Sequence, residues 1–354
     1  MTPSIFPSEL AGPSVRVGVV GAGYWGPNLI RNFNDLEAAE LRWICDLDAA
    51  RLQTFARRYP AVQTTQALED LLADDELDAI AIATPVSTHH ELTLAGLDAG
   101  KHVFVEKPLA ASAAEAEELA TTASARHLTL MPGHTFLYSP PVNKIRELIE
   151  GGELGDIYFI STSRVNLGLH QSDVSVAWDL GPHDFSILHY WLDETPSHLS
   201  AISRSCIFPT IPDIAFISLE WEQGAIAHVE LSWLAPSKLR RTTIVGSSKM
   251  VVYDDVSTEP VRVFDSGVLL DDPRTFGEFH LSYRTGDIVS PALRPAEPLA
   301  VELADFCNAV RTGSTPRSSA ELGVEVVRMI EAVDASLASG GGRVDLGAPL
   351  ALAP

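Results

Sequence analysis

Two separated segments of the chain carry residues whose types and spacing suit them to chemistry. Residues 15–26 form an apolar, β-branched run that ends in a Gly-x-Gly-x-x-Gly pattern, and residues 100–108 end in Glu106-Lys107-Pro108. A glycine turn between a strand and a helix lets main-chain N–H groups approach a pyrophosphate. A lysine at the end of a later strand would add a positive charge at the same edge. In this order, the two segments predict a dinucleotide site with a lysine placed beside it by the later strand.

The glycines of the first segment have separate predicted tasks. Gly21 would permit the tight turn, Gly23 the close approach of the pyrophosphate, and Gly26 the packing of helix on strand. Pro27 suits the first turn of the helix that follows. Taken alone, the motif is also explained as a purely structural turn.

An acidic residue follows at the distance that such a site requires. The strand predicted at residues 41–46 ends in Asp46, about 20 residues beyond the last glycine, where a carboxylate binds the adenosine ribose hydroxyls. This carboxylate would repel a 2′-phosphate, so NAD(H) is favoured over NADP(H). Two alternatives stay open: Asp46 only caps the helix predicted at 49–58, or Arg51 or Arg57 reaches a phosphate.

The elements that must position these groups alternate between strand and helix. After a short third strand near 62–63, strands are predicted at 78–83 and 101–105, separated by a helix at 88–99. This alternation predicts an α/β domain with a doubly wound parallel sheet, whose ligands bind beyond the carboxyl ends of the strands. Three residues would lie on that edge: Thr84, Pro85 and Lys107.

The pattern changes after residue 133. A helix predicted at 142–150 ends at a double glycine, and short strands separated by turn residues then dominate, as in an antiparallel sheet. These strands are predicted at 157–165, 214–221, 225–233, 241–246 and 250–253. The chain is therefore divided into a dinucleotide-binding domain (1–133), a substrate-binding α+β domain (134–343) and a flexible tail (344–354).

Together, these segments resemble the family of glucose-fructose oxidoreductase and inositol dehydrogenase (Gfo/Idh/MocA). The matching stretches are 21–28, 45–48, 83–89, 100–108, 178–184 and the closing stretch 297–336. The resemblance implies an N-terminal Rossmann domain and a C-terminal domain with one large open, mainly antiparallel sheet. It also implies a homodimer or homotetramer formed through the free face of that sheet. Within the family, residues 133–140, 164–168 and 178–184 are most similar to nucleotide-sugar 3-dehydrogenases.

A proton-transfer pair is predicted within residues 178–184. Pro182 fits the first turn of a helix, which would put His183 at the helix N-terminus, where the helix dipole favours neutral imidazole, the form that accepts a proton. Asp179, just before that helix, would hold the ring in one tautomer. The resemblance gives Lys107, Asp179 and His183 the roles of catalytic lysine, aspartate and histidine. Taken singly, they are also explained as a surface lysine, a helix cap and a core histidine.

The predicted contacts form two sets. The cofactor set comprises Gly21, Gly23, Tyr24, Trp25, Gly26, Asp46, Thr84, Pro85, His89, Glu106 and Lys107, and the substrate set comprises Lys107, His134, Tyr138, Arg164, Asn166, Asp179 and His183. His89 is also explained as a helix cap, and His134 as a turn residue. Arg164 would hold a carboxylate or diphosphate by paired hydrogen bonds, or lie exposed on a strand face.

Composition limits the classes of function. The 354-residue chain carries 47 acidic and 25 basic residues, a net charge of −22 that opposes attraction to nucleic acid or anionic membranes. Cys45, Cys206 and Cys307 lack disulfide or zinc spacing and are predicted to be reduced core thiols; no metal is expected. Residues 1–14 do not read as a signal peptide, and no apolar run approaches about 20 residues, so we expect a soluble, cytoplasmic protein.

The sequence thus predicts an NAD(H)-dependent oxidoreductase that transfers hydride between nicotinamide and a ring alcohol or ketone of a sugar. A nucleotide sugar is the first choice, and the resemblance alone suggests its 3-position. Two alternatives stay open: a dehydrogenase of free sugars or of cyclitols such as inositol, and a non-catalytic regulator that keeps the dinucleotide site. The regulator would need none of Lys107, Asp179 and His183.

Overall fold

The computed structural model describes residues 12–168, 170, 174–271 and 280–347, which fall into two compact units. The first unit contains the described residues up to Tyr138 together with Ala296–Val327. The second contains the described residues of Ser139–Pro295 and of Arg328–Pro349. The N-terminal residues on which the expectation of no signal peptide rested lie outside the described part, apart from 12–14.

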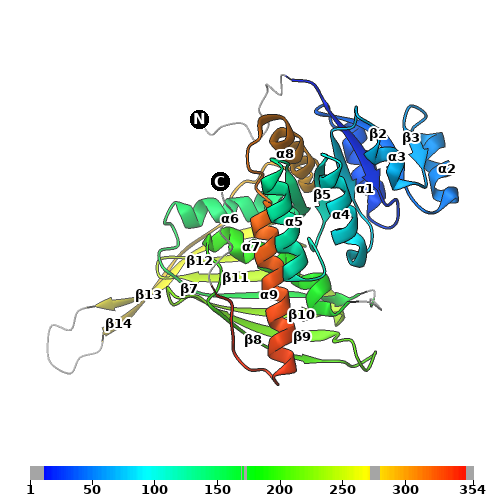
Figure 1. The fold of residues 1–354 in the computed structure, drawn as a ribbon. Helices are drawn as coiled ribbons and strands as arrows, with labels where there is room; N and C mark the ends of the chain where they lie inside the picture. The colour runs from blue at the N-terminus through cyan, green and yellow to red at the C-terminus, as the bar shows by residue number, and fades with distance from the viewer. Residues whose placement is uncertain (1–11, 169, 171–173, 272–279, 348–354) are drawn as a thin grey trace. The chain divides into compact units, whose positions relative to one another are not determined.

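Six parallel strands make up the sheet of the first unit (Figure 1). They are β1 (Val15–Val20), β2 (Ala39–Cys45), β3 (Gln63–Thr65), β4 (Ala79–Ile82), β5 (His102–Glu106) and β6 (Leu130–Gly133). Their order in the sheet is β3-β2-β1-β4-β5-β6, and each of these pairings is parallel. Apolar residues of the central strands are buried, as expected of a parallel sheet covered on both faces. The predicted doubly wound sheet is confirmed.

Helices follow the strands of this unit. They are α1 (Gly26–Asp35), α2 (Ala49–Arg58), α3 (Leu68–Leu72), α4 (His89–Asp98) and α5 (Ala113–Ala125), with the 3₁₀ turns η1 (Val86–Thr88) and η2 (Thr135–Tyr138). A later helix, α8 (Pro298–Thr312), contacts α1 and η2, and its Phe306 ring meets Phe104 of β5 edge-on, 5.8 Å between centroids. Because of this packing, residues 296–327 join the first unit. The contiguous division predicted at 133 and 343 therefore differs from the observed one.

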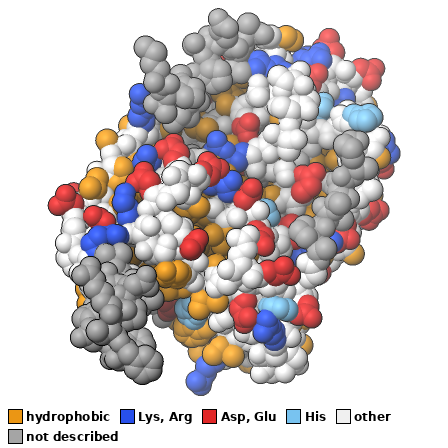
Figure 2. All heavy atoms as spheres, turned by 90° about the vertical axis from the view of Figure 1, so that its left-hand side faces the viewer, with side chains coloured by type: hydrophobic (Ala, Val, Ile, Leu, Met, Phe, Trp, Pro, Cys, Tyr) orange, Lys and Arg blue, Asp and Glu red, His pale blue; other side chains and the backbone are white. Residues whose placement is uncertain are grey.

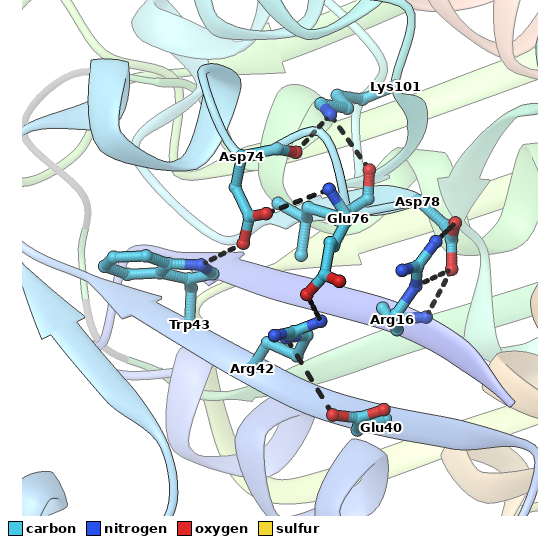
Figure 3. A network of polar contacts seen from close by, with 9 residues as sticks. Arg16, Glu40, Arg42, Trp43, Asp74, Glu76, Asp78 and Lys101 are labelled. Atoms are coloured by element: carbon cyan, nitrogen blue, oxygen red, sulfur yellow. Dashed lines mark hydrogen bonds and ion pairs between the residues drawn. The ribbon is translucent and has the colours of Figure 1, made fainter.

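A polar network fastens the amino-terminal edge of the first sheet (Figure 3). Arg16 binds Asp78 through two N–O contacts of 2.7 and 3.0 Å and thereby joins the start of β1 to the start of β4. The buried Lys101 ammonium donates to the carbonyl oxygens of Asp74 at 2.7 Å and Leu77 at 2.9 Å. These contacts lie at the amino ends of the strands. The predicted ligand site lies at the opposite edge, at the carboxyl ends.

Nine strands form the sheet of the second unit. They are β7 (Ile157–Leu167), β8 (His198–Arg204), β9 (Ile214–Glu220), β10 (Ile226–Ser232), β11 (Leu234–Gly246), β12 (Met250–Asp254), β13 (Val261–Asp271), β14 (His280–Val289) and β15 (Val344–Asp345). The order is β14-β13-β12-β11-β7-β10-β9-β8-β15. Within the described residues, β7 and β10 pair in parallel and the other neighbours pair antiparallel. The predicted large, mainly antiparallel sheet is confirmed.

The predicted flexible tail begins inside this sheet. Val344 and Asp345 pair with Leu199 and His198 of β8, so they form an edge strand rather than a frayed end. Residues 348–354 of the predicted tail lie outside the described residues.

Helices of the second unit are α6 (Pro140–Glu150), α7 (Val176–Leu192) and the part of α9 (Ala320–Ala338) that follows Val327. α7 contacts β7, β9 and β10 and buries Phe185 and Leu188. It therefore covers one face of the sheet around the parallel pair.

Surface and core composition agree only partly with the sequence-based expectations. Figure 2 shows acidic, basic and hydrophobic side chains interspersed over one face of the molecule, without a continuous basic stripe on that face. Cys45 and Cys307 are buried, but Cys206 is exposed, so the prediction of a core thiol is wrong at this position. Within the described part of the chain, no helix is both long enough and apolar enough to cross a membrane.

Candidate functional site

The glycine turn after β1 has the backbone shape of a pyrophosphate cradle. Gly21 has a φ of +92°, and a Cβ there would lie 2.7 Å from the carbonyl oxygen of Ala83. At Gly26, a Cβ would lie 2.0 Å from the carbonyl oxygen of Gly21. Because both distances are too short for a side chain, the turn folds tightly against the start of α1. That helix begins with Pro27 in its first turn and has no side-chain cap among the described residues, so its first N–H groups suit a phosphate.

Asp46 directly follows β2, beside this turn. Its Oδ2 accepts a hydrogen bond from the Ala22 N–H at 2.7 Å, and its Oδ1 accepts one from the Asp48 N–H at 2.8 Å. The N-cap of α2 is Asp48, whose side chain accepts from the N–H groups of Ala50 and Arg51. The alternative that Asp46 merely caps this helix is therefore wrong. Each carboxylate oxygen keeps a further lone pair, so Asp46 fits the ribose hydroxyls of a dinucleotide.

A positive charge lies next to the same carboxylate. Nη1 of Arg51 is 3.6 Å from Oδ2 of Asp46, and its Nε is 3.4 Å from Oδ2 of Asp48. The Arg51 side chain is 52% exposed, so water screens these contacts. A carboxylate and a guanidinium therefore lie side by side at the end of β2.

A buried histidine joins the loops that follow β4 and β5. Nε2 of His89 lies 3.0 Å from the carbonyl oxygen of Thr84, and its Nδ1 lies 2.8 Å from that of Pro108. Burial lowers the pKa of His89, while the two carbonyl contacts oppose this shift. The side chain is 1% exposed, which argues against the direct cofactor contact predicted for it. Its contacts instead fix the loops that carry Thr84 and Lys107.

Carboxyl groups surround the carboxyl end of β5. Burial raises the pKa of Glu106 to about 7, and a Cβ at Gly133 of the neighbouring strand would lie 3.1 Å from its Oε2. Glu302 of α8 is fully buried and accepts a hydrogen bond from the Thr135 hydroxyl at 2.7 Å. Burial, and then the charge of Glu106, raise the pKa of Glu302 well above its usual range. Lys107 follows Glu106 directly and is half-buried, and its charge acts to lower the pKa of Glu106, against the effect of burial.

Two residues of the predicted substrate set lie inside the first unit. His134 is 1% exposed and Tyr138 is 3% exposed. The Tyr138 hydroxyl donates to Asp305 of α8 at 2.7 Å, and the guanidinium carbon of Arg317 lies 4.9 Å from the ring centroid. Tyr138 therefore ties η2 to α8. Its burial, like that of His134, argues against the substrate contact predicted from the sequence.

The second unit carries Asp179 and His183 on α7. This helix begins at Val176, so Asp179 lies in its first turn and Pro182 lies inside it. The prediction that the helix starts at Pro182 is wrong, because a proline within a helix removes one N–H donor without necessarily ending the helix. His183 lies in the second turn, whereas the dipole acts mainly within the first, so that argument for a neutral imidazole fails. Residues four apart share one side of a helix, so Asp179 and His183 are neighbours on α7.

A tryptophan that we did not predict to belong to the site contacts Asp179. The indole N–H of Trp233, directly after β10, donates to Oδ2 of Asp179 at 3.0 Å. The carbonyl of Trp233 accepts from the N–H of Gly168, and a Cβ at Gly168 would lie 3.2 Å from Oδ1 of Asn166. The structure thus brings Asp179 and the half-buried Asn166 to the ends of β7 and β10. The alternating pattern of β10 marked Trp233 only as the last residue of a strand.

Arg164 has a partner inside the second unit. Its Nε lies 2.6 Å from Oδ2 of Asp184 and its Nη2 lies 3.3 Å from Oδ1, while the Thr162 hydroxyl donates to the same Oδ1 at 2.9 Å. The side chains of Arg164 and Asp184 are 5% and 4% exposed. This buried pair joins β7 to α7 next to His183. It argues against both expectations from the sequence, an exposed arginine and a guanidinium that binds a substrate anion.

Comparisons with known proteins agree with this architecture. Residues 15–134 match the oxidoreductase family with an NAD-binding Rossmann fold, and residues 142–252 match the GFO/IDH/MocA C-terminal domain. The D-xylose 1-dehydrogenase (NADP(+)) 2 of Haloferax volcanii is 28% identical over 91% of this chain and 97% of its own. The myo-inositol 2-dehydrogenase of Thermotoga maritima is 25% identical over 87% and 92% of the two chains.

A solved structure supports the fold over nearly the whole chain. The UDP-N-acetylglucosamine 3-dehydrogenase GnnA of Acidithiobacillus ferrooxidans has a TM-score of 0.77 and 23% identity, covering 91% of this chain and 97% of that one. The two family matches together span more than half of the sequence, in the order in which the two sheets occur. The chain therefore belongs to the Gfo/Idh/MocA family and is an oxidoreductase with an NAD-binding Rossmann domain.

Proposed function

We propose that this oxidoreductase transfers hydride between NAD(H) and a ring secondary alcohol or ketone of a sugar. A nucleotide sugar, at its 3-position, is the first candidate, because residues 133–140, 164–168 and 178–184 resemble those of nucleotide-sugar 3-dehydrogenases. The observation that supports the proposal is the position, each within its own unit, of three side chains of types that donate or accept protons. Lys107 follows β5 at the carboxyl edge of the first sheet, and Asp179 and His183 share one side of α7 in the second unit. A non-catalytic regulator would need none of the three.

Each of these residues has a separate task in the proposed reaction. Bound NAD⁺ supplies the acceptor for the hydride that leaves the alcohol carbon. His183 accepts the hydroxyl proton on a ring nitrogen, and Asp179 holds the imidazole in the required tautomer and stabilises its protonated form. Lys107 donates a hydrogen bond to the same oxygen as negative charge develops on it, an effect worth about 2.7–4 kcal/mol per donor. In ketone reduction, His183 returns the proton to the oxygen.

The preference for NAD(H) over NADP(H) is part of the proposal. Asp46 supports it, because its carboxylate is fixed by two main-chain N–H groups at the end of β2 and would repel a 2′-phosphate. Membership of the family does not decide the question, since the relative from Haloferax volcanii is an NADP(+) enzyme by name. The proposed dinucleotide contacts are the turn between Gly21 and Gly26, with Tyr24 and Trp25, the Asp46 carboxylate and the loops that begin at Thr84 and Glu106.

A second candidate is a dehydrogenase of free sugars or cyclitols. One observation favours it: Arg164, the group predicted to hold a diphosphate or carboxylate, is buried against Asp184. Relatives that align over most of the chain are named for D-xylose and myo-inositol. The chemistry at His183 and Lys107 would be the same for both candidates, so they differ only in what is attached to the ring.

The test follows reduced-nicotinamide absorbance while NAD⁺ or NADP⁺ is offered with UDP- and dTDP-sugars, free hexoses and inositols. We expect turnover with a nucleotide sugar and a kcat about 10²–10³-fold lower in Lys107→Ala, with NAD⁺ binding by calorimetry unchanged. Lys144→Ala, which removes a lysine paired with Glu147 on the surface of α6, is the matched control. Wild-type turnover in Lys107→Ala would contradict the mechanism, and bound cofactor without turnover on any substrate would favour the regulator.

We also propose that copies of the chain associate through the free face of the second sheet. Exposed apolar side chains pair across its strands: Ile202 opposes Phe216, and Ile226 opposes Phe159. Apolar neighbours of this kind are typical of a surface that a partner covers. Light scattering tests the assembly, and a monomeric mass would contradict it.

A further inference from the structure

The side chain of Trp233 is held firmly beside the proposed catalytic helix. It is 1% exposed, its main-chain N–H donates to the carbonyl of Asp213 at 3.0 Å, and its own carbonyl accepts from Gly168 at 3.0 Å. The Asp213 carboxylate in turn accepts from the N–H groups of Cys206 at 2.9 Å and Ile207 at 2.8 Å. The backbone around the indole is thus anchored on both sides, and close packing limits rotation of the ring.

The acceptor of the Trp233 indole N–H is a carboxylate, as it is for the half-buried Trp178, which donates to Oδ2 of Asp334 at 2.7 Å. Buried tryptophans donate this single N–H to a nearby acceptor, and in two others of the unit the acceptor is a main-chain carbonyl. Trp191 donates to Val142 at 2.9 Å, and Trp221 donates to Glu194 at 3.0 Å. Trp233 instead donates to Oδ2 of Asp179, and hydrogen bonds to a charged carboxylate are stronger than those between neutral groups.

We infer, on the basis of the proposed function, that Trp233 is a positioning residue for the reaction. Its indole N–H holds one carboxylate oxygen of Asp179 and so leaves the other oxygen to orient the imidazole of His183. A rotated Asp179 would still be present but would no longer select the imidazole tautomer that accepts the substrate proton. Trp233 acts through Asp179 and needs no contact of its own with substrate or cofactor.

The central experiment is Trp233→Phe, which keeps an aromatic ring and removes the N–H. A hydrogen bond to a charged group is worth roughly 1.5–3 kcal/mol, so kcat is expected to fall about 10- to 100-fold, with KM for the sugar and Kd for NAD⁺ close to wild type. The matched control is Trp191→Phe, because Trp191 lies on the same helix as Asp179, is also 1% exposed and donates to a carbonyl. Trp191→Phe is expected to leave kcat unchanged at temperatures where the protein is folded.

Two further variants separate positioning from a general loss of packing. Trp233→His keeps a ring N–H in less volume and is expected to recover part of the kcat lost in Trp233→Phe. In an Asp179→Ala background, Trp233→Phe is expected to have no further effect, because the group on which it acts is gone. The effects of the two single variants and the double variant on kcat are compared as a double-mutant cycle. Thermal unfolding measures separately how much stability is lost when the packing around the ring changes.

The outcomes distinguish this inference from the proposed function. If Asp179→Ala keeps wild-type kcat, the role of Asp179 in the proposed function is contradicted. If Asp179→Ala lowers kcat but Trp233→Phe does not, the positioning role is overturned and the proposed function stands. Full additivity of Trp233→Phe and Asp179→Ala, or an equal loss of kcat in Trp191→Phe, would also overturn it.

Discussion

Replacing Arg164 by alanine should destabilise the second unit rather than weaken substrate binding. In the wild type, Arg164 contributes two of the contacts to the Asp184 carboxylate, at 2.6 and 3.3 Å, and the Thr162 hydroxyl contributes another at 2.9 Å. Among the described residues, Arg164→Ala leaves this buried carboxylate with the Thr162 hydroxyl as its remaining side-chain partner. Breaking a buried ion pair from one side costs about 3–5 kcal/mol, because the remaining charge is neither solvated nor paired.

The size of this effect is measurable by thermal unfolding. In a domain of roughly 150–250 residues, 1 kcal/mol shifts Tm by about 2–4 °C, so the unfolding transition should move down by about 6–20 °C. The double variant Arg164→Met with Asp184→Leu removes both charges and fills the space with apolar side chains, and it should recover most of the loss. Circular dichroism follows the transitions, and KM is measured well below the lower Tm.

Two results would contradict a purely structural role for Arg164. An Arg164→Ala protein with wild-type Tm and a KM raised only for nucleotide sugars would show that the guanidinium binds a diphosphate, as the sequence suggested. A double variant that is less stable than Arg164→Ala would show that the cost does not come from the unpaired Asp184 charge.

Two further predictions concern the first unit. Asp46→Ser removes the carboxylate that pairs with Arg51 and that would repel a 2′-phosphate. The ratio of kcat/KM for NADP⁺ to that for NAD⁺ should therefore rise about tenfold or more, which corresponds to about 1.4 kcal/mol. An unchanged ratio would place Asp46 away from the ribose. Because burial raises the pKa of Glu106 to about 7, the folded protein keeps a proton that the unfolded chain releases near its usual value of about 4.3. The stability contributed by this group is therefore complete below that value and is lost as pH rises toward 7. Glu106→Gln should flatten this part of the curve, measured as urea midpoints at several pH values, and an identical slope in both proteins would contradict the assignment.

Local patterns made the first sheet predictable, and tertiary contacts explain what was missed. Apolar runs that end in glycine, proline or an acid located β1, β2, β4 and β5, because each buried parallel strand is marked within its own few residues. The return of α8 to the first unit depends on contacts such as Phe306 with Phe104, which no local pattern contains. The start of α7 was misplaced because proline favours a first turn, while packing against the sheet carries this helix through Pro182.

The candidate site divides in the same way. Gly21, Gly26, Asp46 and Lys107 lie at strand ends or in the turn that follows, where sequence position alone predicts the edge of the sheet. The partners of Arg164 and Asp179 come from other elements, so their roles depended on pairings with Asp184 and Trp233 that only the folded chain creates. For that reason the sequence predicted which residues lie at the strand ends better than it predicted the partners of Arg164 and Asp179.

The parallel pairing of β7 and β10 determines how the chain must run between β7 and β8. β7 and β8 run in the same direction, since β10 is parallel to β7 and two antiparallel pairings separate it from β8. A chain that joins two such strands needs a crossover over the sheet, and α7 is that crossover. A crossover at this place is thus required by the strand order, whatever side chains occupy positions 179 and 183. A relative that lost both residues would keep this crossover, and under the proposed function it would lose the groups that transfer the proton.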